Sequence, residues 1–357
     1  MLDIGQVHRK EYELLNDRSA PVAIAEAPGR IHFLGDQGEQ EAGLYLSAAI
    51  DRCIHVAISA RKDNSIRFFA ADLGERKRST ISNLKYRRED RWANYLKPAI
   101  ALFIELGYPV KGLNFSFCGD IPQQIALASS TAIEVAAAAA LRNILHAQIN
   151  DMDFAEKLRD AHETMFENSA SLADYYICLT AKKDHFLLVD TIEDTVKLIK
   201  SPFSRFRILL VDSRVPRLGV ESEIISRHED ILEGLKLLTE KRQGAGFKDF
   251  APTDLIEALG DFPEQIRRRS MHIVEEIHRI YDAVAALERS DLASFAKIIY
   301  HSHESIRDLY EISCPEIDWL VKRAQEIEGA AGSRMTGIGF GGCTYTIIRR
   351  ELVEEYK

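Results

Sequence analysis

The sequence has no apolar run long enough to cross a membrane. Its longest candidate, residues 126–141, is interrupted by Ser129, Ser130 and Glu134. The N-terminal segment MLDIGQVHRKEYELL lacks the apolar core of a signal peptide. Cysteine is also scarce, with five residues, an odd number, and no Cys-x-x-Cys pair. We therefore expect a cytoplasmic protein with reduced, mostly buried thiols and no zinc site built from cysteine.

Positive charge is in deficit as well. The 357 residues include 46 Lys and Arg against 55 Asp and Glu, which gives a formal net charge of −9. Nucleic acid is therefore disfavoured as a partner, because neutralising its phosphates requires a basic face. With 46% hydrophobic residues, the chain is long enough for two domains or one large domain. Ser201-Pro202 separates two β-rich segments, so we place the domains at residues 1–200 and 201–357.

Apolar periodicity predicts a mixture of strands and helices without the strict alternation of a doubly wound fold. We expect strands at residues 23–27, 48–58, 113–117, 185–189, 206–211 and 344–348. We expect helices at residues 7–17, 92–107, 132–145 and 153–168, and a mostly helical region at 221–311. The charged segment 76–91 predicts a loop or a covering segment.

The first of three informative segments, residues 27–39, reads APGRIHFLGDQGE. Arg30 lies among apolar residues and therefore needs an anionic partner. Asp36, Gln37 and Glu39 are residue types that accept hydrogen bonds from the hydroxyl groups of a polyol. Taken alone, the segment is equally compatible with a structural ion pair followed by a solvated turn.

The second segment, residues 118–132, brings Ser129, Ser130 and Thr131 to the start of a predicted helix. Free N–H groups and the positive end of the dipole make a helix N-terminus suitable for phosphate, although these residues are also ordinary helix caps. The third segment, residues 329–343, holds six glycines within fourteen residues. That density permits positive φ and close approach of the backbone to a ligand. A strand follows it, unlike the long helix that follows a dinucleotide-binding turn.

Together, and in this order, the three segments resemble the GHMP small-molecule kinases, and the galactokinases most closely. The sequence WANY at residues 92–95, HESIRDLYEISCPE at 303–316 and RMTGIGFGGC at 334–343 are also similar to stretches of that family. The resemblance covers nearly the whole chain. It implies an α+β, two-domain GHMP kinase fold. An N-terminal α/β domain is joined to a ferredoxin-like C-terminal domain, with the active site in the cleft between them.

The resemblance also implies a reaction, the ATP-dependent phosphorylation of a sugar at its anomeric hydroxyl group. Galactose is the sugar that the resemblance suggests, and ATP and Mg²⁺ are the implied cofactors. Asp174 falls on the catalytic Asp of the family and Arg30 on its partner. This assignment is chemically coherent, because a cation beside a carboxylate keeps it ionised and an ionised carboxylate accepts a hydroxyl proton. Arg30 would also stabilise charge on the transferred phosphoryl group.

The remaining site residues follow from the same resemblance. Sugar binding is assigned to Asp36, Gln37 and Glu39. Nucleotide binding is assigned to Leu127, Ala128, Ser129, Ser130, Thr131 and Trp92. The third glycine loop is formed by Gly337, Gly339, Gly341 and Gly342. The metal site is assigned to Ser130 and Glu163.

The chain departs from the family at several of these motifs. The two glycines of the family's phosphate loop are replaced by Gln124 and Ala126. The position of the magnesium-binding Glu is His162, a poor ligand for magnesium, with Glu163 beside it. A sugar-contacting Tyr of the family is replaced by Ile224.

Two interpretations therefore stay open. The first is a divergent sugar-1-kinase that acts as a monomer on a small sugar and ATP. The second is a non-catalytic relative that binds a sugar or a nucleotide as a sensor or regulatory protein. The presence of both Arg30 and Asp174 favours the kinase.

Overall fold

The structure is a computed structural model that describes residues 2–17, 19–37, 42–122, 125–216, 219–258 and 260–356. Its contacts divide the chain into two compact units. Unit 1 comprises Met1–Arg30, Ala49–Gln123 and Leu127–Ala181. Unit 2 comprises Ile31–Ala48, Gln124–Ala126 and Lys182–Lys357. Strands β1 (Val22–Leu34) and β2 (Leu44–Ala60) contribute residues to both units. The domain boundary near residue 200 stays a prediction.

The strands of unit 1 follow the order β4-β3-β5-β2, with β1 paired to β2. The further strands are β3 (Ser65–Ala70), β4 (Glu75–Thr80) and β5 (Leu113–Gly119). Strand β5 pairs in parallel with β3 and antiparallel with β2, from Ile54 opposite Gly119 to Ala60 opposite Leu113. Because β5 has paired neighbours on both edges and is buried along nearly its whole length, it forms the centre of this unit.

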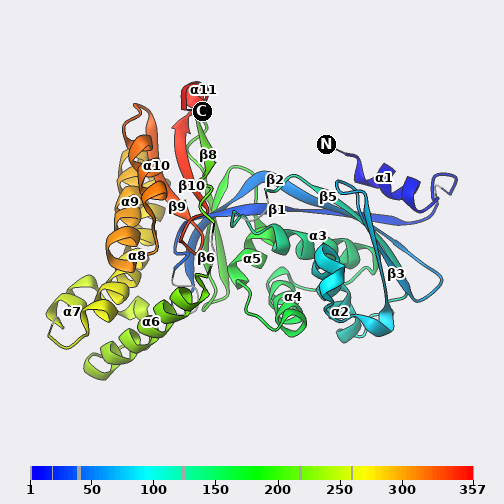
Figure 1. The fold of residues 1–357 in the computed structure, drawn as a ribbon, viewed down its shortest axis with the longest axis horizontal. Coiled ribbons are helices and arrows are strands. Elements are labelled where there is room, and N and C mark those ends of the chain that lie inside the picture. Colours follow the sequence, from blue (N-terminus) through cyan, green and yellow to red (C-terminus); the bar gives the residue numbers. More distant parts are fainter. Residues whose placement is uncertain are drawn as a thin grey trace. The chain divides into compact units, whose positions relative to one another are not determined.

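Helices gather on one face of these strands, as Figure 1 shows. They are η2 (Arg88–Leu96), α2 (Lys97–Glu105), α3 (Ser129–Ile144), α4 (Asp151–Phe166) and α5 (Leu172–Thr180), and the short η1 (Ile81–Asn83) precedes them. The alanine-rich run of α3 is almost entirely buried, which lets its backbone lie close to α2 and α5. Helix α1 (Ile4–Glu11) packs through Ile4 against Ala57 and Cys118.

Unit 2 contains two separate sets of antiparallel strands. The first residues of β2, Leu44–Ser47, pair with β6 (His185–Asp190), which continues to β7 (Thr195–Lys200). A separate antiparallel sheet has the order β8-β10-β9, with bounds β8 (Phe206–Asp212), β9 (Ala330–Thr336) and β10 (Cys343–Arg349).

The helices of unit 2 lie mainly between β8 and β9 in the chain. They are α6 (Glu221–Lys241), η3 (Phe247–Asp249), α7 (Pro252–Glu257), α8 (Glu264–Glu288), α9 (Leu292–Ser305), the π-helix η4 (Ile306–Tyr310) and α10 (Pro315–Gln325). The chain ends with η5 (Arg350–Leu352) and α11 (Val353–Tyr356). Helices α9 and α10 pack on the β9–β10 pair, which lies beside them in Figure 1.

The mixed α+β class and most expected elements are confirmed, including β2, β5, β6, β8, β10, α3 and α4. Residues 76–91 were expected to form a loop or a covering segment, and the loop is wrong for most of this range, because β4, η1 and the start of η2 form there. Alternate side chains of β4 are exposed, so its charges remain in water. The expected helix at 92–107 begins as a 3₁₀-helix and becomes α-helical only at Lys97. Within the described ranges, no helix is long and apolar enough to cross a membrane.

Candidate functional site

Arg30 and Asp174 form a buried, bidentate ion pair in unit 1. Arg30 Nε donates to Asp174 Oδ1 at 2.5 Å, and Nη2 donates to Oδ2 at 2.7 Å. The two side chains are 9% and 10% exposed. Asp174 lies in the first turn of α5, where the helix dipole also favours a negative charge. The structure therefore brings together the two predicted catalytic residues, 144 positions apart in the chain.

The backbone at Arg30 contacts the predicted phosphate loop just before α3. The backbone N–H of Arg30 donates to Leu127 O at 3.2 Å. A Cβ atom at Gly29 would lie 2.8 Å from the same carbonyl oxygen, so only glycine allows this approach. The Pro-Gly-Arg sequence thus fixes Arg30 to the residues just before α3.

The predicted phosphate loop keeps a left-handed backbone although its glycines are gone. Ala126 has a φ of 63° and Ala128, the residue that precedes α3, has a φ of 58°. No side chain caps the start of α3 from that position. Ser129, Ser130 and Thr131 form the first turn and are partly exposed. Gln124, at the other replaced glycine, lies outside the described residues.

His162 belongs to a buried hydrogen-bonded cluster. Its Nδ1 lies 2.7 Å from Glu134 Oε1, and its Nε2 lies 3.2 Å from Asn168 Oδ1. The second oxygen of Glu134 accepts the Tyr175 hydroxyl at 2.6 Å. Burial raises the pKa of Glu134. Burial alone would lower that of His162, but the hydrogen bond to Glu134 gives a net rise in pKa.

Sequence reasoning missed Glu134 and Tyr175. The available signal was Glu134 within the otherwise apolar run of residues 132–141, because a charged residue there needs a buried partner.

Glu163, the predicted metal ligand, uses one carboxylate oxygen to accept the Ala170 N–H at 3.0 Å. Among the residues described, no group of three or more His, Cys, Asp or Glu side chains is arranged to hold a metal ion. A Ser130 hydroxyl and a Glu163 carboxylate are the hard oxygen donors that Mg²⁺ accepts, and the ion ordinarily completes its shell with phosphate oxygens and water. By donor type, these two side chains therefore suit a magnesium ion that arrives with a nucleotide.

In unit 2, Asp36 and Gln37 lie buried beside Arg334. Arg334 Nη2 donates to Asp36 Oδ1 at 2.6 Å and to Gln37 Oε1 at 3.0 Å. The other Asp36 oxygen accepts the Gly337 N–H at 2.6 Å, and Gln37 Nε2 donates to Gly337 O at 3.3 Å. These atoms of the two predicted sugar-binding side chains thus hold their turn onto the glycine loop. Glu39 lies outside the described residues.

Arg334 is completely buried and joins further groups. It donates to Glu276 Oε1 at 3.2 Å and to Ser302 Oγ at 2.8 Å. Glu276 also accepts the Gly35 N–H at 3.2 Å and Arg279 Nε at 2.8 Å. Two carboxylates, those of Asp36 and Glu276, thereby balance two guanidinium groups.

The third glycine loop needs its glycines. Gly337, Gly339, Gly341 and Gly342 all have positive φ, between 87° and 121°. A Cβ atom at Gly339 would also lie 2.8 Å from Ile312 O. Because the loop is packed against that segment, substitution would strain both the backbone and the contact.

Trp92 donates its indole N–H to Glu75 at 2.8 Å, and its ring lies against Phe117. Ile224 lies in the first turn of α6.

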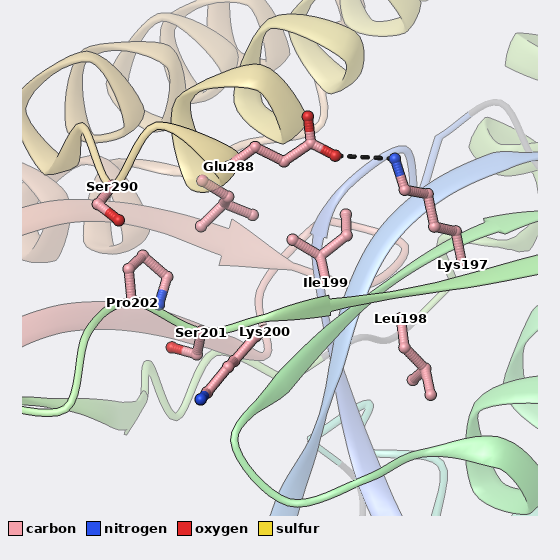
Figure 2. A pocket seen from close by; sticks show the side chains of 9 residues that line it. Lys197, Leu198, Ile199, Lys200, Ser201, Pro202, Glu288 and Ser290 are labelled. Atoms are coloured by element: carbon pink, nitrogen blue, oxygen red, sulfur yellow. Dashed lines mark hydrogen bonds and ion pairs between the residues drawn. The ribbon is translucent and has the colours of Figure 1, made fainter.

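A cavity of about 440 Å³ lies between β7 and the end of α8, where Lys197 pairs with Glu288 (Figure 2). No predicted site residue lines this cavity.

Comparison with known families gives three matches. Residues 94–182 match the GHMP kinases N terminal domain, and residues 283–356 match the GHMP kinases C terminal model. Residues 8–60 match the galactokinase galactose-binding signature. With the fold and the Arg30–Asp174 pair, these matches define the class as GHMP kinases.

Individual relatives show which family within the GHMP kinases the chain resembles. A relative from Treponema pallidum (strain Nichols) is 36% identical over 361 residues, which cover 100% of this chain and 89% of its own. A galactokinase of Roseiflexus sp. (strain RS-1) is 30% identical, with 100% of this chain and 90% of its own covered. The crystal structure of Lactococcus lactis galactokinase complexed with galactose superposes with a TM-score of 0.90 at 21% identity, covering 99% of this chain and 92% of its own. The chain belongs to the galactokinase family.

Proposed function

We propose that this protein transfers the terminal phosphoryl group of ATP to the anomeric hydroxyl group of galactose or a closely related sugar. The buried, bidentate pair of Arg30 and Asp174 is the observation that carries the proposal. The galactose-binding signature over residues 8–60 and the names of the relatives support galactose as the first sugar to test.

Asp174 is the proposed general base. The Arg30 guanidinium group and the N-terminal end of α5 both favour the ionised form of its carboxylate, and this is the form that accepts a hydroxyl proton. Arg30 remains charged throughout and is available to stabilise negative charge on the phosphoryl group as it moves. The pair thus supplies both a base and a fixed cation.

The nucleotide is proposed to bind at the start of α3. The first-turn residues Ser129, Ser130 and Thr131 offer backbone N–H groups and hydroxyls, and Leu127 and Ala128 lead into that turn. Trp92 is proposed to lie beside the nucleobase of the same nucleotide. Ser130 and Glu163 would hold Mg²⁺, which neutralises phosphate charge when bound.

The sugar is proposed to bind beside the turn that carries Asp36, Gln37 and Glu39. Asp36 and Gln37 fix this turn onto Gly337, so their contribution includes shaping the turn as well as direct contact. The glycine loop of Gly337, Gly339, Gly341 and Gly342 is the proposed backbone wall of that site.

We also propose that the protein works as a cytoplasmic monomer on small molecules, without nucleic acid or membrane partners. The net charge of −9 supports the exclusion of nucleic acid. Size-exclusion chromatography with light scattering tests the monomer, and a mass of twice 40.3 kDa would contradict it.

The test is ADP release from magnesium-ATP across a panel of hexoses, uronic acids and amino sugars. We expect sugar-dependent turnover that falls at least about 100-fold in Asp174→Asn, because the base is lost. Asp160→Asn is the matched control, since Asp160 is exposed and pairs only with its neighbour Arg159 among the contacts described. If no sugar gives turnover while a sugar alone raises the Tm, the protein is a non-catalytic sensor and the proposal is wrong.

A further inference from the structure

We propose that Glu134 is a positioning residue that, through Tyr175, fixes the catalytic Asp174 relative to the phosphate-binding turn of α3. The inference rests on the proposed function, because it assigns Glu134 a part in the same reaction. It concerns a cluster within unit 1 and three of its helices, α3, α4 and α5.

Glu134 lies on α3, one helical turn after the proposed phosphate site. It lies four residues after Ser130, so the two side chains share one face of α3, one turn apart. Its side chain is 0% exposed, and each carboxylate oxygen has a described partner, His162 on one side and Tyr175 on the other. A buried carboxylate with both oxygens engaged holds its partners at a defined distance.

Tyr175 transmits that position to the catalytic residue. It is adjacent to Asp174 in α5, a helix of nine residues, and its hydroxyl donates to Glu134 Oε2 at 2.6 Å. Helix α5 is also bonded to β1. Arg30 makes two hydrogen bonds to Asp174, and Cys178 Sγ donates to Pro28 O at 3.2 Å. The Tyr175 bond joins α5 to α3.

His162 completes the cluster from α4. It gives Glu134 a hydrogen-bonded partner that is able to carry positive charge, which a buried carboxylate requires. The three side chains therefore act as one unit, and removing any member leaves a buried polar group without its partner. Effects of mutations within such a unit are expected to be non-additive.

A second Tyr–Glu contact in the same helices provides a matched control. Tyr176 of α5 donates to Glu156 Oε1 of α4 at 3.0 Å. Glu156→Gln and Glu134→Gln are therefore the same chemical change at the acceptor of an α5 tyrosine. They differ in that Glu134 belongs to the helix that begins with Ser129 and Ser130, is fully buried and also bonds His162, whereas Glu156 is half-buried.

The experiment compares Glu134→Gln, His162→Gln, the double variant, Tyr175→Phe and Glu156→Gln by steady-state kinetics and thermal unfolding. We expect Glu134→Gln and Tyr175→Phe to lower kcat by about 10- to 100-fold, since small misplacements of a reacting group have effects of this size. KM for ATP and for the sugar should change by less than about threefold. The Glu134→Gln/His162→Gln double variant should match the worse single variant rather than the product of the two. Glu156→Gln should keep the wild-type kcat.

Two outcomes would overturn the proposal. One is a Glu134→Gln variant with the kcat of Glu156→Gln; the other is a loss that disappears when activity is expressed per folded molecule. If the wild type gives no turnover with any sugar, the proposed function fails first, and amide hydrogen exchange then decides the positioning separately. Residues 172–176 should exchange faster in Glu134→Gln than in both the wild type and Glu156→Gln. Equal rates in all three proteins would contradict it.

Discussion

Asp36 and Arg334, 298 residues apart in the chain, form a buried ion pair with 2.6 Å between Oδ1 and Nη2. The same guanidinium group also contacts Glu276 at 3.2 Å. Because Asp36 further accepts the Gly337 N–H, the turn of the first segment, residues 27–39, is bonded to the glycine loop of the third segment. Two motifs that are distant in sequence are thus bonded directly to each other within unit 2.

Removing the Asp36 carboxylate should therefore destabilise the protein. We expect Asp36→Ala to lower the free energy of unfolding by about 3 kcal/mol, at the lower end for a broken buried pair because Glu276 still faces Arg334. Urea denaturation measures the change. Asp308→Ala, which removes an exposed pair with Arg307, is the control and should stay within about 0.5 kcal/mol of wild type. Equal effects of the two variants would contradict the prediction.

The buried carboxylate of Glu276 leads to a prediction about how the stability of the protein depends on pH. Burial alone would raise its pKa, but Arg279 and Arg334 lower it from 4.5 to about 2. A depressed folded pKa stabilises the protein fully above pH 4.5, and that stabilisation, about 3 kcal/mol, is lost as the pH falls from 4.5 towards 2. We expect Glu276→Gln to make the dependence of stability on pH shallower in this window. Urea titrations at several pH values check this, and parallel curves for the two proteins would disprove it.

Much of the fold was predictable because long, periodic segments report directly on burial. The apolar run of α3 and the alternation of residue types at 113–117, which lie in β5, needed no tertiary information. Helix α5 was missed, since its nine residues are almost all buried and have no amphipathic period. Strand β4 was missed for the opposite reason. Its charged residues resemble a loop, and only pairing with β3 makes it a strand.

The candidate site was predictable to a different extent. Arg30 and Asp174 were identified by motif, and the structure places them in contact. The hydrogen-bond partners of Asp36 could not be foreseen, because a motif reveals residue types but not which of them face each other. The cluster around Glu134 was hidden for the same reason, since its three members come from three helices.

The left-handed backbone of the predicted phosphate loop leads to opposite expectations for glycine substitutions in the loop and in α3. Ala126 and Ala128 both adopt positive φ, a conformation that is strained for any residue with a Cβ atom. We expect Ala126→Gly and Ala128→Gly each to raise the free energy of unfolding by about 0.5–1 kcal/mol. Ala132→Gly, inside α3, is the control and should lower it by about 1 kcal/mol, because glycine weakens a helix interior. Destabilisation by all three would show that the loop carries no such strain.

Substitutions of Arg30 test whether its charge alone or its bidentate geometry matters beside Asp174. Both Nε and Nη2 bond the two Asp174 oxygens, which a lysine ammonium group cannot reproduce. We expect Arg30→Lys to keep the protein folded and to lower kcat/KM for the sugar by about 100-fold or more. Arg30→Met leaves the buried Asp174 carboxylate without this cation, and should lower the free energy of unfolding by about 3–5 kcal/mol.

Steady-state kinetics and urea unfolding of both variants separate the two effects. Arg52→Lys is the control, because Arg52 forms an exposed pair with Asp120 in the same unit. It should match wild type in both measurements. If Arg30→Lys keeps the wild-type kcat/KM, a point charge is sufficient beside Asp174, and the bidentate contact serves stability rather than catalysis.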